Sequence, residues 1–198
     1  MKLFNSLSRQ VEEFVPLHDG KVGMYTCGPT VYSYVTIGNW RTYMLGDLLL
    51  RTLTYSGYEV DYIMNITDVG HLTGDNLGDA DLGEDRLEKA ANKEGRTAWD
   101  IAEFYSKDFF AGYTKLNLTE PRLWCKATDH IAEQIAMVKI ILDKGLAYQI
   151  SDGIYFDTQA YEAGGNVYGK LSTLSQIKEG ARVEPNPEKK DPRDFALW

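Results

Sequence analysis

Two glycines, Gly28 and Gly38, flank a break in the chain where a nucleotide phosphate could bind. A short apolar run at residues 22–25 predicts a buried strand, which stops at a Gly-Pro pair beginning at Gly28. An amphipathic run begins near residues 37–39 and continues through Leu53, which predicts a helix. The first turn of a helix has free backbone N–H groups and the positive end of the helix dipole. Because neither glycine has a side chain, this order of strand, tight turn and helix start favours an anion site close to the backbone.

The elements that must position this break form a strand–helix–strand unit. The helix, expected at residues 38–56, ends at a Ser-Gly pair, and a second strand rich in Tyr, Val and Ile follows at residues 59–66. Such a unit joins parallel strands by a right-handed crossover, and ligands bind beyond the carboxyl ends of the strands. Cys27 and Thr67 both fall at those ends, so we expect them to lie close together.

The rest of the chain predicts a mixed set of elements. We expect an N-terminal hairpin at residues 3–15 and helices at residues 85–115 and 129–144. A second hairpin is expected at residues 146–157, followed by a loop-like tail at residues 161–198. The first of these helices can be interrupted at Gly95, with Thr97 as the N-cap of the part that follows. Residues 79–84 predict a solvated acidic loop, since their spacing does not fit a calcium-binding loop. We expect a domain boundary near Pro121.

Six segments, in order along the chain, resemble those of one enzyme family. They read CGPTVY, TIGN, NITD, ATDHI, GARV and DFALW, at residues 27–32, 36–39, 65–68, 127–131, 180–183 and 194–198. Together they are similar to the motifs of cysteinyl-tRNA synthetases, which are class I aminoacyl-tRNA synthetases. Several ordered motifs are far more specific than one glycine pattern.

The resemblance implies an α/β fold, namely a Rossmann-like, HUP-type parallel-sheet half-domain with an α+β connective insertion. Residues 1–121 would form the amino-terminal part of the Rossmann catalytic domain and residues 122–198 the insertion. The implied enzyme converts cysteine and ATP, with Mg²⁺, to cysteinyl-adenylate and pyrophosphate, and passes the cysteinyl group to tRNA(Cys). The second half of the sheet, the KMSKS loop and the anticodon-binding region do not occur in these residues. We therefore expect the isolated chain to be nearly inactive and most tRNA contacts to come from other parts.

Cys27 has two interpretations. A free cysteine at a strand end is commonly a small buried hydrophobic residue. The resemblance implies instead a Zn²⁺ ligand, with an open metal position that accepts the thiolate of the substrate cysteine. By the same resemblance, the family's other ligands, a Cys, a His and a Glu, lie in a later segment, so we expect them beyond residue 198. The three histidines of this sequence do not match those positions.

Thr36 departs from the family pattern, which has histidine at the first position of the TIGN segment. That histidine donates to the ATP phosphates as charge develops in the transition state. Threonine is a shorter, neutral donor, and the alternative is that Thr36 only caps the helix. By resemblance, Thr36 and Asn39 act in catalysis, and ATP contacts are expected from Gly28, Thr30, Tyr32, Gly38 and Asn39.

Thr67 is expected to orient the bound cysteine near its ammonium or carboxylate group, by the same resemblance. Without the matching flanks it would be a strand end followed by a turn at Asp68. On the predicted helix, Trp40, Met44 and Leu48 are expected to lie in the core rather than in the site.

Size, composition and charge narrow the class of protein. The chain has 198 residues, of which 43% are hydrophobic and 25% charged, as in ordinary globular proteins. Its net charge of -8 and the lack of a Lys/Arg cluster do not favour nucleic-acid binding by these residues alone. We expect no membrane segment and no secretion signal, because no sufficiently long apolar run occurs. The two cysteines are then free thiols, and we expect a cytoplasmic monomer.

Two other functions stay open at this point. The chain could be a truncated or split non-catalytic module that binds a nucleotide or a partner, which Thr36 and the end at Trp198 favour. It could also be a related cysteine ligase that transfers the adenylate to a sugar amine. The sugar-amine ligase fits less well, because the connective segment follows the tRNA synthetase pattern.

Overall fold

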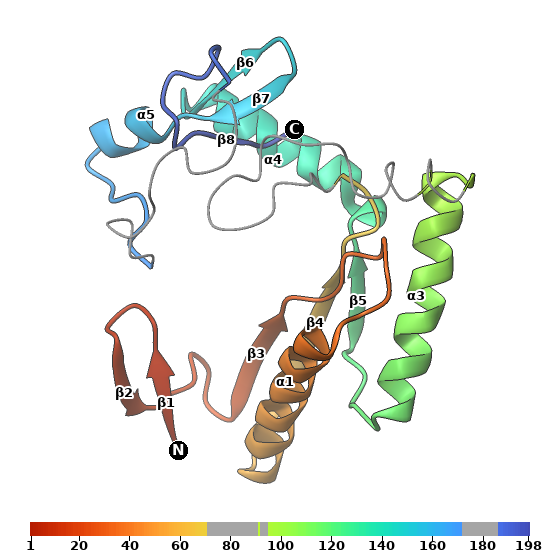
Figure 1. The fold of residues 1–198 in the computed structure, drawn as a ribbon. Coiled ribbons are helices and arrows are strands. Elements are labelled where there is room, and N and C mark those ends of the chain that lie inside the picture. Colours follow the sequence, from red (N-terminus) through yellow and green to blue (C-terminus); the bar gives the residue numbers. More distant parts are fainter. Residues whose placement is uncertain (71–90, 92–94, 172–185) are drawn as a thin grey trace. The chain divides into compact units, whose positions relative to one another are not determined.

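The computed structural model describes residues 1–70, 91, 95–171 and 186–198. The contacts between residues divide the chain into two compact units. The parallel-sheet unit contains the described residues among 14–71 and 85–130. The antiparallel unit contains those among 1–13 and 131–198. Figure 1 labels the helices and strands of both units.

A three-stranded parallel sheet forms the centre of the parallel-sheet unit (Figure 1). Its strands lie in the order β3 (Lys21–Thr26), β4 (Glu59–Ile66) and β5 (Leu123–Lys126). Met24 pairs with Tyr62, and Met64 pairs with Trp124. Helix α1 (Ile37–Tyr55) connects β3 to β4, and helix α3 (Ala98–Lys115) precedes β5. The predicted strand–helix–strand unit and the α/β fold class are confirmed.

Strand β5 belongs to this sheet although it follows Pro121. Its residues continue the parallel pairing on the far side of β4. A short 3-10 turn, η1 (Thr128–His130), ends the unit. The sheet therefore extends past the boundary that the sequence suggested, because the strand after Pro121 pairs with β4 instead of starting a new layer.

Capping side chains set where both helices begin. Thr36 is the N-cap of α1, and Ser56 caps its end, where Gly57 adopts a φ of 92°. Helix α3 starts with a full capping box, in which Thr97 and Asp100 bond to each other's backbone N–H groups. The predicted N-cap at Thr97 is confirmed, whereas most of residues 85–94 lie outside the described part of the chain.

Aromatic side chains dominate the core between the sheet and the two helices. Phe109 of α3 is fully buried, and it stacks on Trp40 of α1 with ring centroids 5.5 Å apart. Trp124 of β5 packs edge-on against Phe109 at 5.7 Å. A β-carbon at Gly112 would lie 2.5 Å from the Trp40 ring, so glycine at that position makes room for the tryptophan. The expected core position of Trp40 agrees with this packing.

Three sequence expectations about burial were wrong. Residues 22–25 were expected to be a buried strand, but β3 alternates, and Tyr25 on its outer face is 64% exposed. Met44 and Leu48 were expected in the core, but they are 50% and 62% exposed. Helix α1 turns Leu50 and Leu53 inward instead, because this face of the helix packs on β3 and β4.

The antiparallel unit contains two small sheets. The N-terminal hairpin pairs β1 (Lys2–Asn5) with β2 (Gln10–Glu13), as predicted. The second sheet has the order β6 (Ala147–Ile150), β7 (Gly153–Phe156) and β8 (Phe195–Ala196), and follows helix α4 (Ile131–Asp143). A short helix, α5 (Thr158–Ala163), follows β7. The tail expected to be loop-like thus contributes the third strand, β8.

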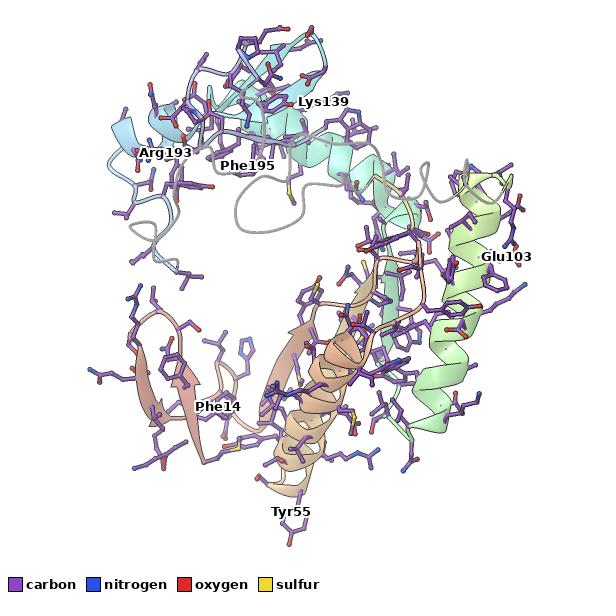
Figure 2. The ribbon with its side chains drawn as sticks, viewed as in Figure 1. Phe14, Tyr55, Glu103, Lys139, Arg193 and Phe195 are labelled. Atoms are coloured by element: carbon purple, nitrogen blue, oxygen red, sulfur yellow. The ribbon has the colours of Figure 1, made fainter. Side chains whose placement is uncertain are left out.

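A buried polar network joins β8 to the rest of its sheet. Asp194 is only 1% exposed, and its Oδ1 accepts bonds from the backbone and hydroxyl of Thr158, at 2.9 and 2.7 Å. Its Oδ2 accepts a bond from the Tyr148 hydroxyl at 2.7 Å and from the Asp191 N–H at 3.1 Å. Figure 2 labels Arg193 and Phe195, which are the neighbours of Asp194 in the sequence. The network fixes the tail through polar contacts within a small core.

None of the helices in the described residues is both long and apolar enough to cross a membrane.

Candidate functional site

The carboxyl ends of β3 and β4 bring two predicted site residues together. Cys27 directly follows β3 and Thr67 directly follows β4, and these two strands are parallel neighbours. The Thr67 N–H donates to the Pro29 carbonyl at 2.9 Å, and the Val31 N–H donates to the Thr67 carbonyl at 3.1 Å. The prediction that Cys27 and Thr67 lie at adjacent strand ends is confirmed.

Gly28 lets the chain after Cys27 run directly against β4. A β-carbon at this position would lie 1.8 Å from the Asn65 carbonyl oxygen. No real side chain can occupy that space, so only glycine fits here without moving the backbone. The sequence suggested that Gly28 leaves room for a nucleotide, but the contact that requires glycine is with the neighbouring strand.

Asn65 is a site residue whose role the sequence did not reveal. Its Oδ1 accepts bonds from the Gly28 N–H and the Tyr25 hydroxyl, both at 2.8 Å. Its Nδ2 donates to the Thr67 hydroxyl oxygen at 3.1 Å. Burial, with Cys27 and Cys125 nearby, raises the pKa of the Tyr25 phenol, so this donor keeps its proton at neutral pH. The NITD motif was a signal, but the partners of Asn65 lie up to 40 positions away in the chain.

Asp68, the last residue of the NITD segment, binds the start of another motif. Its carboxylate accepts bonds from the Thr128 N–H at 3.0 Å and from the Thr128 hydroxyl at 2.7 Å. Thr128 begins the turn η1 after β5. Asp68 therefore joins the ends of β4 and β5, which is a structural task beside the candidate site.

Cys27 is exposed at the strand end and supplies one soft metal ligand. Its Sγ lies 3.7 Å from the Gly28 carbonyl oxygen. Within the described residues, no group of three or more His, Cys, Asp or Glu side chains is arranged to hold a metal. A zinc site takes three or four protein ligands, so Cys27 does not form one with its described neighbours.

The TIGN segment forms the first turn of α1. The Thr36 hydroxyl accepts a bond from the Asn39 N–H at 3.4 Å and donates to Asn39 Oδ1 at 2.8 Å. Asn39 also bonds the buried Tyr43, and burial raises the pKa of Tyr43 to about 12. Gly38 is exposed, and the atom nearest to an added β-carbon is Thr36 Oγ1 at 3.7 Å. The fold therefore leaves open space at Gly38.

Residues 28–32 form the connection from β3 towards α1. Thr30 makes an isolated parallel bridge with Thr67, which extends the pairing of the two strands. Val31 is buried in the core, and Tyr32 packs against it while remaining partly exposed. The loop that carries Thr30 and Tyr32 is thus anchored at its centre and tied to β4.

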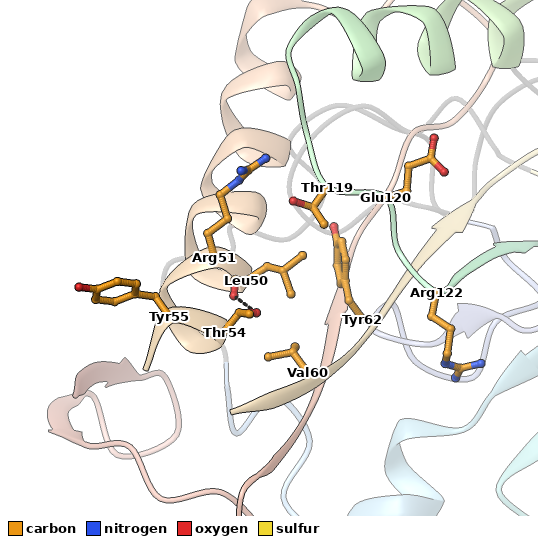
Figure 3. Close-up of a pocket in the computed structure, with 9 residues that line it drawn as sticks. All are labelled: Leu50, Arg51, Thr54, Tyr55, Val60, Tyr62, Thr119, Glu120 and Arg122. Carbon is orange, nitrogen blue, oxygen red and sulfur yellow. Dashed lines mark hydrogen bonds between the residues drawn. The ribbon is translucent and has the colours of Figure 1, made fainter. Parts of the chain in front are cut away.

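A shallow cavity of about 610 Å³ lies at the opposite end of the same sheet (Figure 3). It contains none of the site residues predicted from the sequence. Leu50, Val60 and Tyr62 form its apolar floor in Figure 3. Other lining residues are Arg51, Thr54, Tyr55, Thr119, Glu120 and Arg122. Tyr55 extends away from the end of α1, as Figure 2 also shows.

Comparison with protein families shows which family the chain belongs to. A family model described as the catalytic domain of class I (C) tRNA synthetases matches residues 13–198. The chain belongs to this family. The resemblance seen in the six sequence motifs is thereby confirmed for this class I synthetase domain.

Relatives of this synthetase domain are cysteine–tRNA ligases. The chain is 46% identical to that of Treponema denticola over 200 residues, which is all of this chain and 39% of the relative. It is 43% identical to that of Zymomonas mobilis, covering 98% of this chain and 36% of the relative. It is also 46% identical to cysteine–tRNA ligase 1 of Burkholderia lata, covering 100% and 41%. The chain thus spans about two fifths of the length of the curated relatives it matches.

Some motifs of the synthetase domain lie outside the described residues. These are the GARV segment at residues 180–183 and the acidic loop at residues 79–84. The other four segments near the candidate site, from CGPTVY to ATDHI, fall in or next to the parallel-sheet unit. DFALW falls in the antiparallel unit, where Asp194 and β8 tie it to the sheet.

Proposed function

We propose that this chain is the amino-terminal catalytic part of a cysteine–tRNA ligase. The observation that carries the proposal is the family match over residues 13–198. The strand ends that carry Cys27 and Thr67 support it, because ligands of parallel sheets bind there. In the proposed reaction, cysteine and ATP give cysteinyl-adenylate and pyrophosphate, and the cysteinyl group then passes to tRNA(Cys). We also propose that the protein is a cytoplasmic monomer.

The cysteine substrate binds between the ends of β3 and β4. Cys27 is exposed there, and the Thr67 hydroxyl lies beside the same connection. Thr67 orients the charged groups of the amino acid, and Cys27 faces its thiol. This arrangement holds the reacting carboxylate close to the start of α1, so binding and orientation supply much of the catalysis.

ATP, with its Mg²⁺, binds over the first turn of α1. The exposed face of Gly38 and the free N–H groups at the helix start favour the phosphates. Thr30, Tyr32 and Asn39 border this position, and Gly28 holds the connection in place by its contact with β4. Gly38→Val should abolish ATP binding in calorimetry while leaving the unfolding transition in place, because space for the side chain exists in the fold. An unchanged ATP affinity would place the nucleotide elsewhere.

Zinc is the metal that the family resemblance suggests for this site. The Cys27 thiolate suits Zn²⁺, but the described residues supply no further ligands to it. We expect these 198 residues alone to retain well under one zinc per chain after dialysis, measured by atomic absorption. A stoichiometric, chelator-resistant zinc would mean that other residues of the chain complete the site.

The proposed function is tested by exchange of pyrophosphate into ATP, using the protein at its natural full length. Exchange should require cysteine and should be far slower with serine. The two cysteines offer a matched pair of variants, since both lie at the same end of the sheet. Cys27→Ser should raise the KM for cysteine by at least roughly tenfold, as expected for a lost substrate contact, whereas Cys125→Ser should resemble the parent. Exchange that ignores cysteine would contradict the proposal.

A non-catalytic nucleotide-binding module is the second candidate. The observation that favours it is Thr36, whose hydroxyl proton is already donated to Asn39 and does not serve a phosphate. Such a module would bind ATP but show no exchange with any amino acid at natural full length. Cysteine-dependent exchange by the parent protein would exclude it.

A further inference from the structure

The carboxamide of Asn65 links the two strand ends that carry the candidate site. It accepts bonds from the Gly28 N–H and the Tyr25 hydroxyl, each at 2.8 Å, and donates to the Thr67 hydroxyl oxygen at 3.1 Å. Gly28 directly follows Cys27, so a single side chain spans the connection after β3 and the residue after β4. Asn65 lies on the outer face of β4, between Met64 and Ile66, which are fully buried on the other face.

The surroundings decide which way round the Asn65 carboxamide sits. A backbone N–H can only donate, so the atom that faces Gly28 must be the oxygen. The amide nitrogen must then face Thr67, and it carries only donors. A rotated carboxamide would place two donors together at Gly28 and would leave its oxygen at Thr67. The orientation therefore follows from the chemistry of the partners.

This orientation fixes how the Thr67 hydroxyl can be used. One of its two lone pairs receives the Asn65 proton, so its own proton cannot point at Asn65. Among the described residues, the Thr67 hydroxyl has no hydrogen-bond partner other than Asn65. Its proton and its second lone pair therefore remain for a partner other than Asn65.

We propose that Asn65 is a positioning residue that presents the Thr67 hydroxyl to the amino acid substrate while holding the Cys27–Gly28 connection beside it. The proposal rests on the proposed function, because it assumes that cysteine binds at these strand ends. It predicts that the contribution of Thr67 to cysteine binding exists only while Asn65 holds it. ATP, which binds at the start of α1, should depend on Asn65 far less.

The test is a double-mutant cycle in the full-length protein, read as the KM for cysteine and the KM for ATP in pyrophosphate exchange. Asn65→Asp keeps the oxygen for Gly28 but forces the Thr67 proton onto the new carboxylate. Asn65→Ser removes the bridge without adding charge. Each should raise the KM for cysteine by roughly tenfold, the loss typical of one ordered hydrogen bond, with the KM for ATP within about twofold. Thr67→Val should give the same loss, and Asn65→Ser combined with Thr67→Val should be no worse than either alone.

Controls separate this role from a purely structural one. Tyr25→Phe removes one bond to Asn65 but leaves the bonds to Gly28 and Thr67, so its KM for cysteine should stay close to that of the parent. Losses at Asn65 and Thr67 that multiply, or that raise both KM values together, would overturn the proposal. If the parent exchanges and Asn65→Ser leaves the KM for cysteine unchanged, Asn65 is excluded and the proposed function stands. A parent that shows no cysteine-dependent exchange would overturn both.

Discussion

The two units of this chain differ in how far their described residues rely on buried polar side chains. The parallel-sheet unit has an aromatic and aliphatic core. Polar side chains lie at its strand ends, where Cys27 is exposed and Asn65 and Thr67 are partly buried. The antiparallel unit buries Asp157, Thr158, Asp191 and Asp194. Every donor and acceptor around Asp194 is used by another residue of the same network. In the first unit, Asp47 of α1 is buried and accepts bonds from Arg51 and the Thr119 N–H, while Asn65 and Thr67 at the strand ends are the residues that we propose for a ligand. In the second unit, the buried polar residues hold the fold.

Two motifs that look equally functional in the sequence each contain a structural aspartate. NITD and DFALW both contain an aspartate beside apolar residues, and both matched the family pattern. Asp68 and Asp194 turn out to be anchors, because each binds a backbone N–H and a hydroxyl of one threonine. Asn65 and Thr67 are instead the residues that we propose serve a substrate. A motif match therefore does not distinguish a structural residue from one that contacts a ligand.

The largest expected effect is at Asp194 of the antiparallel unit. Asp194→Ala leaves the buried Thr158 donors and the partly buried Tyr148 hydroxyl without their acceptor and should lower the free energy of unfolding by about 3–5 kcal/mol. Urea denaturation measures this loss. Glu188→Ala is the control in the same unit, since Glu188 binds Ser151 at the exposed surface and should cost less than about 1 kcal/mol. Equal losses in the two variants would contradict the idea that burial makes this network structural.

The next largest effect compares two glycines of the parallel-sheet unit. Gly28→Ala should lower the free energy of unfolding by about 3 kcal/mol, because its β-carbon would lie 1.8 Å from the Asn65 carbonyl oxygen. Gly38→Ala should be neutral or slightly stabilising, since its β-carbon meets nothing nearer than 3.7 Å and alanine favours the helix. Thermal and urea unfolding of both variants provide the measurement. A stable Gly28→Ala variant would show that the connection after β3 can move away from β4.

Acid should weaken the antiparallel unit through Asp191. Its bonds to the Arg193 guanidinium lower the pKa of Asp191 from 3.8 to about 2, despite the opposing effect of burial. A lowered folded-state pKa stabilises the fold above pH 3.8, and this contribution is lost as the pH falls towards 2. We expect a loss of about 1–2 kcal/mol across that range, read from urea denaturation at several pH values.

The matched variants for this pH effect are Asp191→Asn and Asp61→Asn. Asp191→Asn should flatten the acid dependence between pH 4 and 2, as roughly expected from its lowered pKa. Asp61 also has a lowered pKa from its Arg122 partner, but this pair is exposed on the parallel-sheet unit. Exposed pairs contribute little to stability, so Asp61→Asn should leave the acid dependence nearly unchanged. The reverse order would place the acid-sensitive interaction in the parallel-sheet unit.

Local patterns predicted the elements of the fold that local physics determines. The bounds of α1 follow from a threonine cap and a Ser-Gly end, and β4 follows from a run of β-branched and aromatic residues. The covered face of α1 was predicted wrongly, because Leu48 and Leu50 are equally apolar and the packing of α1 on β3 and β4 decides between them. Strand β8 was missed because two residues become a strand only when β7 pairs with them.

The adjacency of two candidate site residues was predictable from the sequence, but the hydrogen bonds around them were not. The positions of Cys27 and Thr67 after two apolar runs were enough to place them at neighbouring strand ends. The role of Asn65 depends on Gly28, 37 positions earlier, and that of Asp68 depends on Thr128, 60 positions later. Such distant partners leave no periodic signal in the sequence. The requirement for glycine at position 28 is likewise visible only once β4 lies against it.

The smallest expected effect concerns Thr36 of the parallel-sheet unit, which is the N-cap of α1 and lies in the proposed ATP site. Thr36→His should speed cysteine-dependent exchange about tenfold in the protein at natural full length, because a longer donor reaches the phosphates. For comparison, removing one donor that stabilises a transition state typically raises the activation free energy by about 2.7–4 kcal/mol. Histidine also gives up the cap on the Asn39 N–H, so the free energy of unfolding of this variant should fall by about 1 kcal/mol. Thr36→Ser keeps the cap and the short donor, so both its exchange rate and its stability should match the parent. A slower Thr36→His variant would mean that the site requires threonine, because the Thr36 hydroxyl orients Asn39 for catalysis. Thr36 would then serve both the fold, as a helix cap, and the ligand.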